Sequence, residues 1–230
     1  MSGRGARGTR TDEVGCDTAD MVVIHRLFRM LFTDAPGLVR GVPDGDTERA
    51  AVVAEHVAEA AGALHNHHHT EDELLWDELE SRAPACALHV GQMRAQHAAV
   101  ARVLDQLGDA LPLWRASADP SDGDRVAALL DEVLALLEEH LGQEEERILP
   151  VAATAMSQRE WDALGEHGRA SVPRDRQMIQ LGWILDSFSS PAEAREWARQ
   201  NLPAPARAIF ALLGRRQFEA HKRIVLGAAV

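Results

Sequence analysis

Residues 64–76 of the chain read LHNHHHTEDELLW, and residues 137–149 read LEEHLGQEEERIL. Both stretches fit the pattern L-x-x-H-x-x-x-E-D/E-E, so the chain contains a short internal repeat. In each copy a histidine and a glutamate stand four residues apart, which on a helix places them one turn apart on the same face. Such a pair can converge on a metal ion. Two pairs in two separate helices predict a helical bundle that encloses the metal.

The first copy allows more than one register, and the apolar residues decide between them. The pair His67/Glu71 continues a row of apolar positions, namely Val53, Val57, Ala60, Leu64 and Leu74. The pair His69/Glu73 lies about 200° around the helix, on a polar face. We therefore expect His67 and Glu71 to point inward, and His65 and His69 to face solvent.

The second copy places His140 and Glu144 in an equivalent apolar row. A single His/Glu pair at this spacing is most often a surface contact that stabilises a helix. Two pairs that both interrupt apolar rows favour a metal site, because a buried and unpaired glutamate is costly. Glu71 and Glu144 in one core would repel each other unless a cation lay between them.

Two further histidines, His25 and His97, lie in apolar rows of their own. Taken singly, each is more often a core histidine than a metal ligand. Their height in the bundle is a separate indication. At 1.5 Å of rise per residue, the inward histidines His25, His67, His97 and His140 all lie about 15 to 22 Å from the same end of an antiparallel bundle. This shared height predicts a single layer of ligands.

The wider pattern predicts an all-α protein: an up-down-up-down four-helix bundle with an appended C-terminal helical segment. We expect a disordered N-terminal tail over 1–16, the bundle over 17–150, and an extension over 157–230 that packs on the bundle through its tryptophans. The expected bundle helices cover 17–32, 47–82, 84–111 and 124–149, with a loop over 34–46. The expected helices of the extension cover 157–168, 173–187, 191–200 and 204–226.

Composition excludes several classes of function. The chain has 230 residues and a formal net charge of −12, which argues against a nucleic-acid binder and against adhesion to anionic membranes. Its two cysteines, Cys16 and Cys86, exclude a disulfide scaffold. We expect reduced thiols, and a single disulfide between the two is the alternative. No apolar stretch approaches the roughly 20 residues of a membrane span. These features predict a cytoplasmic protein.

The order His25, His67-x-x-x-Glu71, His97, His140-x-x-x-Glu144 resembles the hemerythrin-like HHE cation-binding proteins, and the resemblance covers residues 17–150. The extension, with LPAPAR at 202–207, resembles the actinobacterial branch of that family. The resemblance implies two non-haem iron ions joined by both carboxylates and an oxo or hydroxo bridge. It makes the four histidines terminal ligands and the two glutamates bridging ligands. Zinc and manganese also suit these ligand types.

The sequence departs from the oxygen-carrying hemerythrins, which use a His-x-x-x-His pair on the third helix. Here Met93 and Ala101 stand one turn before and after His97. Together with Ala63, these two residues are the candidates for the outer part of the metal pocket. The remaining histidines, namely His56, His65, His68, His69, His89, His167 and His221, are expected to face solvent or to lie outside the ligand set. One ligand fewer would leave open metal positions, and this favours chemistry with dioxygen, peroxide or nitric oxide.

The predicted function is therefore the binding or reduction of a small oxidant by iron that cycles between Fe(II) and Fe(III), with a role in oxidative or nitrosative stress. No catalytic acid or base and no electron donor can be identified. Two alternatives are a sensor of oxygen, iron or redox state that signals through the C-terminal helices, and reversible oxygen binding. A third is a helical interaction module with a vestigial ligand layer. Metal content separates this last class from the others.

Overall fold

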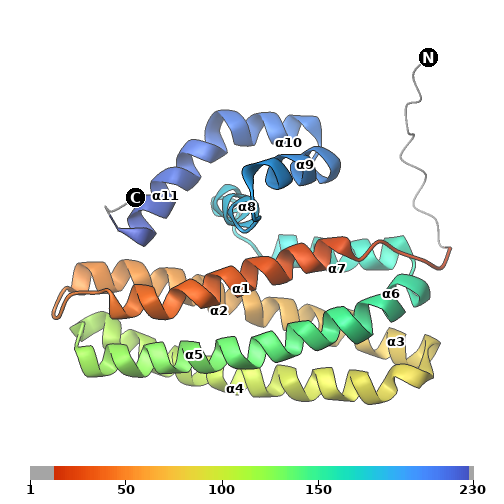
Figure 1. Cartoon of the computed structure of the whole chain (residues 1–230), viewed down its shortest axis with the longest axis horizontal. Coiled ribbons are helices and arrows are strands. Elements are labelled where there is room, and N and C mark those ends of the chain that lie inside the picture. Colours follow the sequence, from red (N-terminus) through yellow and green to blue (C-terminus); the bar gives the residue numbers. More distant parts are fainter. Residues whose placement is uncertain (1–12, 228–230) are drawn as a thin grey trace.

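The computed structural model describes residues 13–227, and it confirms the all-α bundle. Four long helices lie side by side and alternate in direction (Figure 1): α1 (Ala19–Arg40), α2 (Thr47–Leu74), α4 (Ala87–Ser117) and α5 (Pro120–Gln143). Helix α1 packs on α2 and α5, and α4 packs on the same two helices. Their inward faces form two apolar clusters, a larger one along most of the bundle and a smaller one that includes Met21 of α1 and Met93 of α4. Among the described residues no strand is present apart from isolated bridges.

Shorter elements extend the bundle. Helix α3 (Trp76–Arg82) follows α2, and a 3₁₀ turn (Pro84–Cys86) leads into α4. Helix α5 runs into a π-helical turn (Glu144–Ile148) and then α6 (Leu149–Ala155). The C-terminal extension contains α7 (Gln158–Ala170), α8 (Gln177–Asp186), α9 (Pro191–Asn201), α10 (Ala204–Ile209), a second π turn (Phe210–Gly214) and α11 (Arg215–Leu226).

Prolines end the bundle helices less sharply than the sequence predicts. The expected loop over 34–46 was wrong in its first half, because α1 continues through Pro36 to Arg40. Helix α4 likewise passes Pro112, and the last bundle helix passes Pro150. An internal proline costs a helix about 3 kcal/mol. Buried apolar residues beyond each proline, such as Val39 and Trp114, outweigh that cost.

Two interruptions lie close to the repeated motifs. The expected continuous helix over 47–82 is broken at Leu75, which separates α2 from α3. In the second copy the chain keeps its direction but widens into the π turn, where the N–H of Leu149 donates to the carbonyl of Glu144. Single π turns inside α-helices are frequent at functional sites.

The N-terminal segment is only partly described. Residues 1–12 of the expected tail lie outside the described residues. The expectation of disorder was wrong for residues 14–16, because the N–H groups of Gly15 and Cys16 donate to the carbonyls of Met156 and Ala153 at 2.7 and 3.1 Å. Cys16 and Cys86 are both free thiols. No helix within residues 13–227 combines the length and the apolar character that crossing a membrane requires.

The extension lies along one side of the bundle (Figure 1). Trp183 of α8 and Phe218 of α11 belong to the same apolar core as the bundle helices. Trp183 stacks at a tilt on His56 of α2, with ring centroids 5.2 Å apart. The guanidinium of Arg49, at the start of α2, donates to the carbonyl oxygens of Ile224 and Val225 at the end of α11.

A glycine sets how closely α8 and α11 approach each other. A Cβ added at Gly182 would lie 2.2 Å from Cγ of Phe218. Overpacking of this kind typically costs 1–3 kcal/mol, so Gly182→Ala should lower the melting temperature by about 5 °C. Gly168→Ala in α7 is the matched control, because no atom lies within 4 Å of its added Cβ. Equal melting temperatures for the two variants would contradict this account.

Candidate metal centre

Every long helix of the bundle delivers polar side chains to one buried layer. They are His25 on α1, His67, His68 and Glu71 on α2, His97 on α4, His140 on α5 and Glu144 at the start of the π turn. The six residues selected from the sequence are thus brought together, and His68 joins them. The side chain of His67 is 11% exposed, whereas those of His25, Glu71, His140 and Glu144 are at most 1% exposed.

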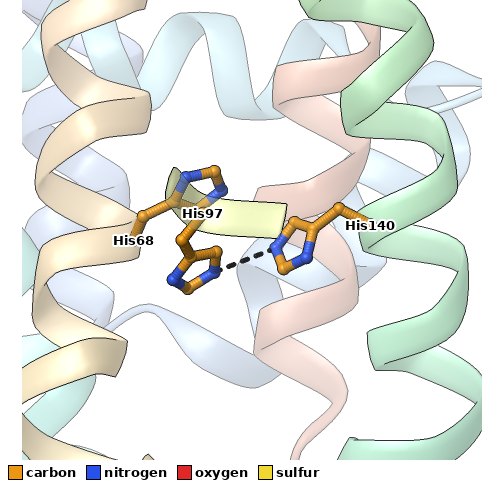
Figure 2. A group of neighbouring side chains, drawn as sticks. All are labelled: His68, His97 and His140. Atoms are coloured by element: carbon orange, nitrogen blue, oxygen red, sulfur yellow. Dashed lines mark hydrogen bonds between the residues drawn. The ribbon is translucent and has the colours of Figure 1, made fainter. Parts of the chain in front are cut away.

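The ligand atoms fall into two groups, and within each group they lie within 4.8 Å of one another. The first group is His25, His67, Glu71 and Glu144, and the second is His68, His97 and His140. Figure 2 shows the three histidines of the second group pointing toward one another from three helices. The Nε2 atoms of His97 and His140 are 3.2 Å apart.

The two glutamates connect the groups. One carboxylate oxygen of Glu71 is 3.4 Å from Nε2 of His67 in the first group, and the other is 3.4 Å from Nε2 of His97 in the second. Oε2 of Glu144 lies 3.3 Å from Nε2 of His25 and 3.7 Å from Nε2 of His140. Each carboxylate therefore faces histidines of both groups.

The expectation that His68 faces solvent was wrong, and the structure places it in the buried layer. Its ring is buried and stacks on His97, with centroids 4.1 Å apart and planes 10° apart. A signal for this was present in the sequence. His68 follows the buried Leu64 by four residues, and an inward helix face is wider than a single row, so neighbouring positions can both point inside. His68 on α2 is thus a fifth histidine of the buried layer, beside His97 and His140.

Most of the inward atoms lack a hydrogen-bond partner within the protein, and the two carboxylates face histidine nitrogens at 3.3 to 3.7 Å. No hydrogen bond reaches Nε2 of His25, His67 or His68, or either carboxylate oxygen of Glu71 and Glu144. Buried polar groups are nearly always hydrogen-bonded, and a buried charge without compensation is costly. A cluster of imidazole nitrogens and carboxylate oxygens that lacks partners on its inner side fits a metal centre.

Three of the histidines are held from behind through Nδ1. The partner is Glu145 for His25 at 2.9 Å, Asp72 for His97 at 2.8 Å and Gln96 for His140 at 3.3 Å. Outer partners of this kind orient an imidazole and leave Nε2 facing inward. The sequence pattern alone does not predict these roles for Glu145, Asp72 and Gln96.

Electrostatics distinguishes the histidines. Burial disfavours a charge on His25, but the carboxylates of Glu144 and Glu145 outweigh it and raise its pKa to about 9. The pKa of His97 is raised to about 9 in the same way, against burial, by Asp72 and Glu71. Burial lowers the pKa of His140 to about 3.

The outer candidates and the other histidines are placed as follows. Met93 is buried, while Ala63 and Ala101 are half-buried. His65 and His69 are exposed and stack on each other, and His167 is also exposed. His89 and His221 are half-buried, and His56 is buried against Trp183. The side chain of His69 is 55% exposed, so the pair His69/Glu73 faces away from the layer.

The carboxylates give the metal-free protein a specific pH dependence. Burial and the charge of Glu144 raise the pKa of Glu71 from 4.5 to about 7. A carboxyl group with a raised pKa binds protons more tightly in the folded state, so it lowers the stability as pH rises from 4.5 toward 7. After chelation, the stability of Glu71→Gln relative to the wild type should therefore increase as pH rises from 4.5 to about 7 and level off above that. Thermal unfolding of both proteins measures this, and a pH-independent difference would contradict it.

Comparison with known proteins agrees with this geometry. Residues 17–152 match a family model described as the hemerythrin HHE cation-binding domain. Neither the search of curated proteins nor that of solved structures gives a match. The matched region begins just before α1 and ends within α6, so it contains every residue of the buried layer.

Proposed function

The chain belongs to the hemerythrin HHE cation-binding family, and on that premise we propose that it is a non-haem di-iron protein that binds or reduces a small oxidant. The oxidant is dioxygen, peroxide or nitric oxide. The observation that carries the proposal is the layer of buried imidazole nitrogens and carboxylate oxygens, most of which lack a hydrogen-bond partner inside the protein.

The arrangement supports two metal ions over one. His25 and His67 would hold one ion, and the three histidines of the second group would hold the other. Glu71 and Glu144 would be shared, because each carboxylate faces histidines of both groups. Imidazole with carboxylate suits iron, and bound iron would supply one-electron chemistry between Fe(II) and Fe(III).

The chain itself controls what reaches the layer. Phe28 packs against the ring of His67, with centroids 5.2 Å apart, and Trp76 packs against His97 at 5.5 Å. These aromatic side chains exclude water and lock the ring orientations. Among the seven residues only His67 has more than a few per cent of its side chain exposed. A layer this deeply buried favours small oxidants over larger substrates.

Metal analysis after expression in iron-supplemented medium tests the proposal. We expect two irons per chain and near-ultraviolet absorption of the oxidised protein. The reduced protein, mixed in a stopped-flow instrument with dioxygen, peroxide or nitric oxide in turn, should be oxidised or form an adduct with at least one of them. One tightly held zinc per chain and no iron under these conditions would overturn the assignment.

One contact favours a second candidate function, that of a sensor. Helix α2 carries three residues of the layer and also packs on the extension through His56 and Trp183. Metal occupancy could therefore change how the extension rests on the bundle. For a sensor we expect iron loading to alter hydrogen exchange in α8 and α11. Hydrogen exchange that is unchanged by iron loading in these helices would contradict the sensor function and leave oxidant handling as the one proposed role.

A further inference from the structure

We propose that Asp72 and Glu145 are positioning residues, each of which completes a two-carboxylate clamp around one histidine of the metal layer. The proposal rests on the proposed metal-binding function and deepens it. The two residues occupy the same place in the internal repeat, directly after the inward glutamates Glu71 and Glu144. This clamp role explains why both copies of the repeat carry an acidic residue at that position.

The geometry of the two clamps is the same. In the first, Glu71 lies 3.4 Å from Nε2 of His97, and Asp72 lies 2.8 Å from Nδ1 of the same ring. In the second, Glu144 lies 3.3 Å from Nε2 of His25. Glu145 lies 2.9 Å from the Nδ1 atom of that ring. Two consecutive acidic residues thus address both nitrogens of one imidazole.

This arrangement is unusual for neighbours in a helix, because residues one apart do not face each other. The histidine lies on a different helix each time: α2 clamps a ring of α4, and α5 with its π turn clamps a ring of α1. The outer carboxylate, Asp72 or Glu145, can therefore contact Nδ1 at the edge of the ring. The preceding glutamate faces Nε2 inside the layer. The break at Leu75 lies three residues after Asp72, and Glu145 lies within the π turn itself.

Each outer carboxylate is itself held in place. Asp72 accepts a hydrogen bond from the indole N–H of Trp76 at 2.7 Å. Glu145 accepts one from the guanidinium of Arg29 at 2.7 Å, and Arg29 also donates to Glu138. A fixed carboxylate at Nδ1 keeps the ring proton on Nδ1, so Nε2 presents its lone pair to the metal.

The repeat supplies its own controls. The next acidic residue in each copy, Glu73 or Glu146, is one position farther along, and their side chains are 49% and 73% exposed. We expect Asp72→Ala and Glu145→Ala each to weaken iron binding by about 10- to 100-fold. Glu73→Ala and Glu146→Ala should bind iron as the wild type does. Competition with a chelator of known affinity measures this.

A second measurement separates positioning from general loss of stability. In the zinc-loaded protein, nitrogen NMR of the histidine rings should show Nδ1–H on His25 and His97. Asp72→Ala should alter this signal for His97 alone, and Glu145→Ala for His25 alone. The melting temperature of each metal-free variant measures the loss of stability by itself, and a merely structural role would not confine the change in ring signal to one histidine.

The outcomes are distinguishable. A wild type that binds iron, with clamp variants that bind it equally well and keep both ring signals, would overturn the clamps and leave the metal-binding function standing. A wild type that binds no iron would overturn the function itself.

Discussion

Replacing Glu144 with alanine should reduce the iron content from two ions per chain to one or none. Glu144 faces His25 and His140 at 3.3 and 3.7 Å and is buried, so no other side chain can take its place at that point. A thousandfold loss of metal affinity corresponds to about 4 kcal/mol. The free energy of metal binding also stabilises the fold, so this loss lowers the stability of the iron-loaded protein. The melting temperature of the iron-loaded protein should fall by about 10 °C.

The control is Glu146→Ala, two residues farther along and mostly exposed, which should retain both ions. Metal analysis and calorimetry of the two variants, purified in parallel, provide the measurement. Equal iron content in both variants would show that the π turn does not contribute a ligand. Chelation should remove most of the difference in melting temperature between Glu144→Ala and the wild type.

Replacing His68 with alanine should also remove about one iron per chain, in this case the ion that we propose for the second group. His68 stacks on His97 and lies edge-on to His140, with centroids 4.9 Å apart, so the group would keep only two imidazoles. His69→Ala is the matched control, because the neighbouring side chain is 55% exposed and points away. The visible spectrum and metal analysis should distinguish the two variants.

His67→Ala provides the test of helix phase. It should lose iron from the first group, whereas His69→Ala should leave the metal content unchanged. Iron lost on replacing His69 but kept on replacing both His67 and His68 would mean that α2 presents a different face to the layer.

The bundle could be predicted because its periodic apolar rows and the spacing of its His/Glu pairs are local properties of the chain. His67 and Glu71 follow from the phase of one apolar row. The same row does not identify His68, which lies beside it within the inward sector of the helix, a sector more than 100° wide. The prolines predict helix ends that are too early for a similar reason. The cost of Pro36 is local, whereas the burial of Val39, which outweighs that cost, depends on the other helices.

The outer partners could not be predicted by this reasoning. Asp72 and Gln96 are polar residues on helix faces, and nothing in their spacing distinguishes them from residues that contact only water. Their role depends on which ring of a neighbouring helix comes within reach of the side chain, and that is a property of helix packing. The acidic residue after each inward glutamate was visible in the repeat, but its meaning requires His25 and His97 to be placed in space.

Both ends of the described chain are fastened to the bundle, and they are fastened at opposite ends of its long axis (Figure 1). Residues 14–16 are held beside α6, and the last turn of α11 is held by Arg49 at the start of α2. A pair of fluorescent or spin labels at Val14 and Leu226 would therefore straddle the metal layer. The distance between the two labels would change if the contact at either end were released. This measurement does not depend on the absorption spectrum of bound iron.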